Sequence, residues 1–127
     1  MTFSFDQILF DLHAAYLDAR RHKRSKKYQI DFEKNLKSNL EQLARELHDR
    51  TYRPAPPKCF VIEDPKKREI FAADFRDRIV HHLYYNYTNE LFERNFIADS
   101  YSCIKGRGTH YGIARLEQHI RKESLNY

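Results

Sequence analysis

A cluster of prolines constrains this chain more than any other feature of its sequence. Three of the four prolines, Pro54, Pro56 and Pro57, fall within four consecutive residues. Each proline fixes its own φ and lacks a backbone N–H, so a helix cannot continue through the cluster and the backbone there is extended. The cluster therefore separates an N-terminal helical extension, residues 1–50, from a second region, residues 51–127.

Two helices are expected before the prolines. Ser4 and Gln7 have the spacing of a capping box, in which the serine caps the helix and the glutamine reaches back. Apolar residues at helical spacing then predict a helix over residues 5–22. A second helix is predicted over residues 31–48, with Asp31 as its N-cap. Its apolar spine consists of Leu36, Leu40, Leu43 and Leu47.

A β-hairpin is expected after the prolines. Residues 59–63 and 68–73 are rich in β-branched and aromatic side chains, which favour strands. The dipeptide Asp64-Pro65 between them suits the first two positions of a type I turn. Lys66 and Lys67 then lie at the tip of the hairpin.

Two more helices follow in the prediction. One runs over residues 74–92, and the other begins at Thr109, which can cap it. The residues expected to face inward in the first helix are Ile79, Val80, Leu83, Tyr84, Tyr87 and Leu91. The apolar face of the second helix consists of Ile113, Leu116 and Ile120. The sequence therefore predicts an α+β fold that is mostly helical and contains one antiparallel β-hairpin.

The positive charge of the chain comes from one short run. The formal net charge is +5, and residues 20–27, RRHKRSKK, contribute +6 of it, which leaves −1 for all other residues. Such a run is either a solvated linker or an arm that contacts phosphates. A basic pI therefore does not by itself establish a basic face on the fold.

The sequence shows neither a membrane segment nor an export signal. No apolar run approaches the ~20 residues that span a bilayer. The first residues, MTFSFDQILFDLH, lack the basic start and the cleavage site of a secretory signal. Cys59 and Cys103 are isolated, and we expect reduced thiols rather than a disulfide. These features predict a cytoplasmic protein with no membrane partner.

Motifs for metal binding or nucleophilic catalysis are weak. His81 and His82 are adjacent, so on a helix they point about 100° apart and do not readily hold one ion. Nothing in the sequence fixes the geometry of a pair between Cys103 and His110. We therefore expect no metal site among these residues.

The acidic residues of the segment DFRDR, residues 74–78, are expected to be structural. Asp74 and Asp77 each lie within two residues of an arginine, which is typical of a network of ion pairs at a helix start. Nucleotidyl transfer needs carboxylates that hold two metal ions ~4 Å apart. The chain contains no Asp-Asp pair, and we expect no catalytic residue in it.

Two cationic loops remain as candidate binding sites. One is the hairpin tip, Lys66-Lys67-Arg68, and the other is the segment KGRGTH, residues 105–110. In the second loop, two glycines let the backbone approach a ligand closely, and the helix start that follows offers free N–H groups. Short basic loops that contain glycine are common, so spacing alone favours two solvated loops over a binding site.

Several ordered segments resemble a known family. They are TYRP (51–54), REIFAADFRDRIVHH (68–82), LFERNFIADSYSCIKGRGTH (91–110) and GIARLEQHI (112–120). Together they resemble the N-terminal fingers of bacterial reverse transcriptases of the retron, group II intron-like and diversity-generating retroelement types. In that family a basic hairpin precedes a helix that opens with an Asp-Arg pair, and a Phe-x-x-x-Ser-Tyr segment leads into a Gly-Arg-Gly loop.

The resemblance implies roles for both cationic loops. The fingers hairpin would fold over an incoming deoxynucleoside triphosphate, with Arg68, Lys66 and Lys67 neutralising its phosphates. The second loop would lie along the RNA template and DNA primer. Its contacts would come from Arg107, Lys105, Gly106 and Gly108. Arg76, at the helix start, would add a template contact, although Arg76 and Arg78 are expected to be mainly structural.

The resemblance also implies what these residues do not supply. Catalytic carboxylates and the Mg²⁺ ions that they hold belong to the palm of the family, which follows the fingers. We therefore expect the 127 residues to be the fingers part of a longer RNA-directed DNA polymerase, inactive alone. We also expect the piece to self-associate, as a homodimer, through apolar helix faces that normally meet the palm.

Two other readings stay open at this point. The second reading is a stand-alone basic nucleic-acid-binding module that uses the same basic loops without catalysis. A third reading is a helical domain whose Tyr- and Leu-rich faces bind a protein.

Overall fold

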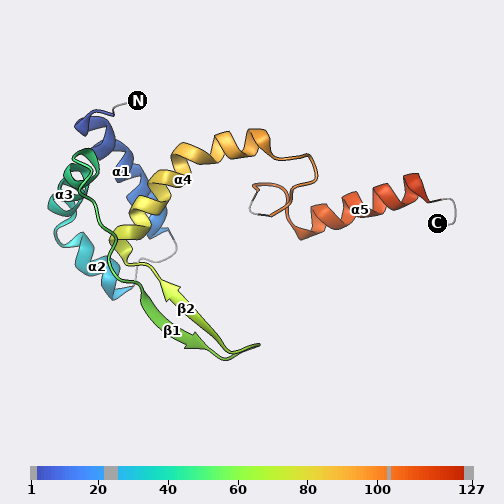
Figure 1. The fold of residues 1–127 in the computed structure, drawn as a ribbon, viewed down its shortest axis with the longest axis horizontal. Helices are drawn as coiled ribbons and strands as arrows, with labels where there is room; N and C mark the ends of the chain where they lie inside the picture. Colours follow the sequence, from blue (N-terminus) through green and yellow to red (C-terminus); the bar gives the residue numbers. More distant parts are fainter. Residues whose placement is uncertain (1–2, 22–25, 103, 125–127) are drawn as a thin grey trace. The chain divides into compact units, whose positions relative to one another are not determined.

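Helices make up most of the structure, a computed structural model that describes residues 3–21, 26–102 and 104–124 (Figure 1). The elements follow in the order α1 (Phe5–Arg20), α2 (Lys27–Glu33), α3 (Leu36–His48), β1 (Lys58–Ile62), β2 (Arg68–Ala72), α4 (Phe75–Asn95) and α5 (Thr109–Glu123). Among the described residues, β1 and β2 pair as a two-stranded antiparallel sheet. The α+β fold expected from the sequence, mostly helical with one hairpin, is confirmed.

The chain separates into two compact units, Met1–Tyr87 and Thr88–Tyr127, and the boundary lies inside α4. The first unit contains α1 to α3, the hairpin and the first turns of α4, so the division that the prolines suggest at residues 50 and 51 falls within it. In this unit α1 and α3 lie side by side, and the hairpin leads away from the helices (Figure 1). The second unit contains the end of α4, the α4–α5 loop (residues 96–108) and α5.

Three helices supply the core of the first unit. Its buried apolar side chains are Leu12, Ala15, Tyr16 and Ala19 from α1, Leu40, Leu43 and Ala44 from α3, and Phe75, Ile79, Val80 and Leu83 from α4. These residues recur at intervals of three and four, so each helix turns one apolar stripe toward the others. Burial of that stripe is the main force that holds the unit together.

The start of α1 matches its sequence signal in part. Ser4 Oγ accepts a hydrogen bond from the backbone N–H of Gln7 at 3.2 Å, as a capping serine should. The Gln7 side chain, however, donates to Asp11 Oδ2 at 2.9 Å instead of reaching back. The helix ends at Arg20, and residue 22, its expected end, lies outside the described residues.

The single helix expected over residues 31–48 is wrong, because the chain breaks between α2 and α3. Asn35 leaves helical geometry at φ −126° and ψ 40°. Across the break, the Asn39 side chain donates to the Phe32 carbonyl at 2.8 Å and so satisfies an acceptor at the end of α2. Asp31 is not a cap but lies inside α2, where its carboxylate accepts from Lys34 Nζ at 2.7 Å.

The expected inward face of α4 holds only for its first turns. Ile79, Val80 and Leu83 are buried and Tyr87 packs against the core, but Tyr84 is 61% exposed and Leu91 is 60% exposed. The prediction that Tyr84 and Leu91 face inward is therefore wrong. In the first unit the core ends with the turn that carries Leu83 and Tyr87.

The cap expected for α5 is also wrong. The N-cap is Gly108, which has no side chain to accept a hydrogen bond, and Thr109 is already the first helical residue. The apolar face of α5, made by Ile113, Leu116 and Ile120, is exposed at 50%, 59% and 39%. The contacts of α5 with the α4–α5 loop come from other side chains and from the backbone of α5, at Gly112, Arg115 and His119.

Candidate functional site

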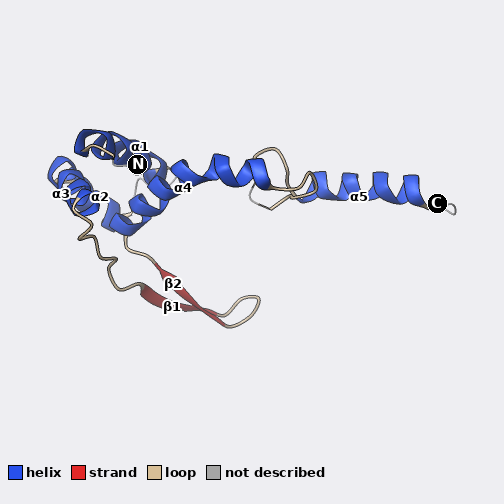
Figure 2. Ribbon diagram, turned by 45° about the horizontal axis from the view of Figure 1, so that its top comes forward, coloured by secondary structure: helices blue, strands red, loops and turns tan. Residues whose placement is uncertain are grey.

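The hairpin is a regular antiparallel ribbon with two different faces (Figure 2). Its register pairs Lys58 with Ala72 at the base and Ile62 with Arg68 next to the tip. Because side chains alternate along a strand, the first face carries Lys58, Phe60, Ile62, Arg68, Ile70 and Ala72, and the second carries Cys59, Val61, Glu69 and Phe71. The turn between the strands contains a cis Asp64–Pro65 peptide bond, which the sequence analysis did not anticipate.

The cations of the hairpin tip are exposed. Lys66 and Lys67 lie in the turn, and Arg68 is the first residue of β2. No ion pair among the described residues includes any of the three, although Glu69 follows Arg68 directly. Glu69 lies on the opposite face of the ribbon from Arg68, because adjacent side chains on a strand point apart.

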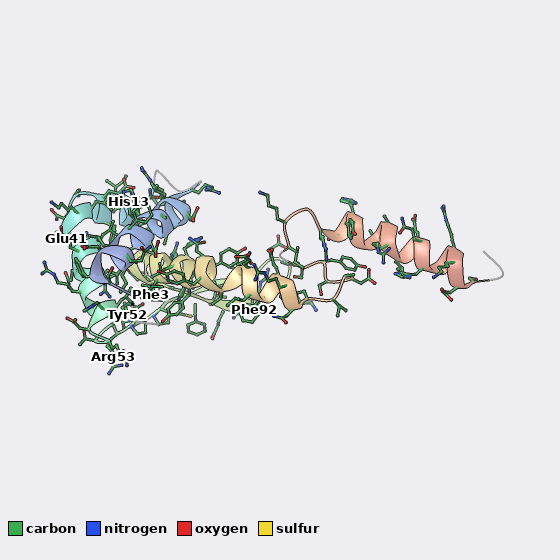
Figure 3. The ribbon with its side chains drawn as sticks, turned by 90° about the horizontal axis from the view of Figure 1, so that it is seen from above. Phe3, His13, Glu41, Tyr52, Arg53 and Phe92 are labelled. Carbon is green, nitrogen blue, oxygen red and sulfur yellow. The ribbon has the colours of Figure 1, made fainter. Side chains whose placement is uncertain are left out.

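The segment that leads into the hairpin is held by a buried carboxylate of α4. Asp77, which is 2% exposed, accepts from Tyr52 OH at 2.6 Å and from the backbone N–H of Ala55 at 2.9 Å. Figure 3 labels Tyr52 and its exposed neighbour Arg53 in this segment. Burial, followed by the hydrogen bond to Asp77, raises the pKa of the Tyr52 phenol. The Asp77 carboxylate thus accepts hydrogen bonds from the Tyr52 hydroxyl and from the Ala55 N–H. The Ala55 N–H has no helical partner, because the prolines keep this segment extended.

The segment that leaves the hairpin is held by the neighbouring arginine. Arg78 Nε donates to the Ala73 carbonyl at 2.9 Å, directly after β2. The same guanidinium donates to Tyr28 OH at 3.3 Å and lies 5.0 Å from the centre of that ring. Both ends of the hairpin are therefore bound to the first turn of α4 by side chains one residue apart.

The rest of the DFRDR segment anchors this turn in the core. Phe75 is 2% exposed and packs among the rings of Tyr16, Tyr28 and Phe32 at centroid distances of 6.4, 5.8 and 5.4 Å. Arg76 forms a half-buried ion pair with Glu46 and lies over the Tyr52 ring. The guanidinium that the resemblance implied as a template contact is thus bound within the fold.

The prediction that Asp74 and Asp77 form ion pairs with the nearby arginines is wrong. Asp74 Oδ1 accepts from the backbone N–H of Arg76 at 3.1 Å, so it serves the helix start, and Asp77 binds Tyr52 and Ala55. Adjacent residues on a helix point about 100° apart, so a carboxylate does not readily meet an arginine next to it. The structural use of both residues agrees with the expectation.

The second cationic loop is a compact turn at the end of the α4–α5 loop. Gly106 takes a left-handed backbone conformation at φ +78°, which favours glycine, and Ile104 and Arg107 form an isolated antiparallel bridge on either side of it. Arg107 Nη1 also donates to the Ala98 carbonyl at 2.9 Å, which closes the loop. Lys105 is exposed at the turn, and Gly108 precedes α5.

This loop is fixed to α5 by side chains that sequence reasoning did not single out. Asp99 Oδ1 accepts from Tyr101 OH at 2.7 Å and from Arg115 Nε at 3.0 Å. These two hydrogen bonds, Tyr101 first, lower the pKa of the Asp99 carboxyl. Because Asp99 and Arg115 are 16 residues apart, no helical or strand spacing signals their contact.

The basic run is partly bound within the first unit. Arg20 Nε lies 3.1 Å from Glu33 Oε1, and Arg21 Nη2 lies 3.0 Å from Asp18 Oδ1. Residues 22–25 lie outside the described part of the chain, as does Cys103, so a pair between Cys103 and His110, which nothing in the sequence supports, falls outside it too. Cys59 is an exposed free thiol on the hairpin.

Side chains that commonly bind metals do not cluster among the described residues. Among residues 3–21, 26–102 and 104–124, no group of three His, Cys, Asp or Glu side chains gathers where it could hold an ion. Within the same residues, no helix has the length and apolar character needed to cross a membrane.

Comparison with known proteins adds no assignment. No protein-family model matches this chain, and no curated protein matches it.

Proposed function

We propose that the chain is the fingers part of an RNA-directed DNA polymerase. Its hairpin tip binds the triphosphate of an incoming deoxynucleotide, and its second cationic loop contacts the template and primer. One observation carries the proposal: the tip presents Lys66, Lys67 and Arg68 to solvent without ion-pair partners among the described residues, on a ribbon whose two ends are bound to α4. Its motifs also resemble those of reverse transcriptase fingers in order and spacing.

The chemistry of the tip suits a triphosphate. A nucleoside triphosphate carries about four negative charges, and phosphoryl transfer spreads further charge over its oxygens. The planar guanidinium of Arg68 can donate two parallel hydrogen bonds to phosphate oxygens, whereas Lys66 and Lys67 act as mobile point charges. Arg68 therefore fixes the phosphates in orientation and the lysines mainly lower the electrostatic energy.

The second loop suits a nucleic-acid backbone. Lys105 and Arg107 supply two cations on either side of Gly106, and at Gly106 and Gly108 no side chain blocks the approach of a phosphate. Arg76 takes no direct part in this proposal, because Glu46 and Tyr52 already hold its guanidinium. Its role is to hold the helix start from which the hairpin projects.

We assign the binding of Mg²⁺ to the palm of the polymerase and not to these residues. Mg²⁺ in this family polarises the phosphates and is held by palm carboxylates, and none of the steps above uses an ion bound by the described residues. The 127 residues alone are accordingly inactive in nucleotide addition. We also propose that the protein is cytoplasmic.

Exposed apolar helix faces favour a second contact, with protein. Ile113, Leu116 and Ile120 of α5 are 39–59% exposed and line one side of the helix. We propose that a second copy of the chain covers this face when the 127 residues are studied alone, which gives a homodimer.

Fluorescence anisotropy of a labelled RNA–DNA primer–template, titrated with the chain over a range of salt concentrations, tests the proposed function. We expect binding that weakens steeply with salt, and a slope of log Kobs against log salt that falls by about 1 for each phosphate contact removed by Lys105→Ala or Arg107→Ala. Arg53→Ala is the matched control, because Arg53 is an exposed arginine outside both loops.

Each outcome assigns the chain to one class. One outcome is that the chain binds in a salt-dependent way but that polypeptides containing these residues add no nucleotide. That outcome identifies a stand-alone binding module. Absence of salt-sensitive binding overturns the nucleic-acid assignment and favours a protein-binding domain.

A further inference from the structure

Asp99 collects more polar contacts than any other side chain that the structure describes in the α4–α5 loop. Its Oδ1 atom accepts from Tyr101 OH at 2.7 Å and from Arg115 Nε at 3.0 Å. Its Oδ2 atom lies 3.5 Å from His119 Nε2. Arg115 and His119 belong to α5, so one carboxylate joins the loop to two successive turns of the helix.

Two further contacts complete this arrangement. The Tyr101 ring lies against Gly112 of α5 so closely that a Cβ atom there would be 3.0 Å from the ring. Arg107 Nη1 donates to the Ala98 carbonyl at 2.9 Å, next to Asp99 in sequence. The contact between Arg107 and Ala98 therefore closes the loop. Asp99 and Tyr101, near the start of the loop, bind it to α5.

We propose that Asp99 is a positioning residue that holds the loop in the conformation that binds a nucleic-acid backbone. This inference rests on the proposed function. A loop that is ordered before binding loses less conformational entropy when Lys105 and Arg107 meet phosphates, so its affinity is higher than that of a mobile loop with the same charges.

The proposal predicts an effect opposite in sign to simple electrostatics. A carboxylate near a polyanion repels it, so removing the Asp99 charge would strengthen binding if Asp99 were only one more surface charge. If Asp99 holds the loop, the same change weakens binding. Glu117 offers a matched control, because it is an exposed acidic residue of α5 outside these contacts.

The experiment compares Asp99→Asn and Glu117→Gln in the 127-residue chain, by anisotropy with the same RNA–DNA primer–template. We expect Asp99→Asn to weaken binding about tenfold with the salt slope unchanged, since the phosphate contacts themselves are retained. Glu117→Gln should bind as tightly as the wild type or more tightly. Tyr101→Phe, which changes no charge and keeps the ring on Gly112, should weaken binding about threefold.

Limited trypsin digestion supplies a second readout that does not involve nucleic acid. Early cleavage after Lys105 and Arg107, followed by mass spectrometry, should be several-fold faster in Asp99→Asn than in the wild type or Glu117→Gln. Circular dichroism of each variant checks that the helices are retained.

The outcomes separate the two assignments. Equal or tighter binding by Asp99→Asn overturns the positioning role, and so does an equal loss in Glu117→Gln. If the wild type binds no nucleic acid, the role in binding falls with the proposed function. If trypsin still cleaves Asp99→Asn faster in that case, Asp99 does hold the loop, and only the proposed nucleic-acid binding is wrong.

Discussion

Replacing Asp77 by asparagine tests how the hairpin is held. The carboxylate is 2% exposed and accepts from Tyr52 OH at 2.6 Å and Ala55 N–H at 2.9 Å. Asparagine has the same shape but only one acceptor oxygen, so that oxygen can keep the Ala55 N–H while its NH₂ group faces the Tyr52 oxygen. The hydrogen of the phenol then has no acceptor in the side chain of residue 77. A hydrogen bond to a charged group is worth about 1.5–3 kcal/mol, and a buried unsatisfied donor adds to the loss. We expect Asp77→Asn to lower the free energy of unfolding by roughly 2–4 kcal/mol.

Urea denaturation followed by circular dichroism measures this loss, with Tyr52→Phe as a second variant. Tyr52→Phe should cost roughly 1–2 kcal/mol, and the double variant should cost less than the sum of the two, because both remove the same contact. Hydrogen exchange gives the local consequence, since the β1 and β2 amides should lose protection before those of α1 and α3. Asp31→Asn is the control: Asp31 is an exposed carboxylate that pairs with Lys34, and its loss should leave the midpoint unchanged.

The reasoning is refuted if Asp77→Asn shifts the midpoint no more than Asp31→Asn does. Strict additivity of the Asp77 and Tyr52 changes would show that the two side chains do not act through one contact.

Two further predictions concern stability at alkaline pH and assembly. Burial, together with hydrogen bonds to Glu33 and Asp11, raises the pKa of Tyr16 and Tyr87 to about 12 from 10.0. Their folded-state pKa lies above the unfolded value, so the stability that they add is fully present below pH 10 and is lost as the pH rises toward 12. Urea midpoints from pH 8 to 12 should fall above pH 10, and less so in Tyr16→Phe; an unchanged fall in that variant contradicts the assignment. Leu116→Lys should shift sedimentation-equilibrium mass from dimer to monomer, and a strictly monomeric wild type at high concentration contradicts the proposed homodimer.

The sequence predicted those elements that are stabilised by contacts between residues close together in the sequence. Ser4 caps α1 because a serine side chain reaches the N–H three residues on. The β-hairpin was predictable because alternating β-branched and aromatic residues flank a short turn. The break between α2 and α3 was not, because the leucine spacing suits a longer helix. That break depends on Asn39 reaching the Phe32 carbonyl and on Glu33 binding Tyr16 of α1.

The cationic residues of the candidate site could be named from the sequence, but the residues that hold them could not. Asp77 finds its partner Tyr52 across 25 positions, and Asp99 finds Arg115 across 16. For Asp77 the neighbouring arginines suggested an ion pair instead, and for Asp99 the sequence suggested no partner. Contacts of this kind are set by how the chain returns on itself, which helical and strand periodicities do not encode.

The central claim is that Arg68 and its lysine neighbours neutralise the triphosphate of an incoming nucleotide. Its most direct test is kcat/KM for single-nucleotide addition by an active polymerase that contains these residues, compared between Arg68→Ala and the exposed-arginine control Arg53→Ala. The account predicts a loss of about 10- to 1000-fold for Arg68→Ala and almost none for Arg53→Ala. An unchanged kcat/KM in Arg68→Ala would contradict it.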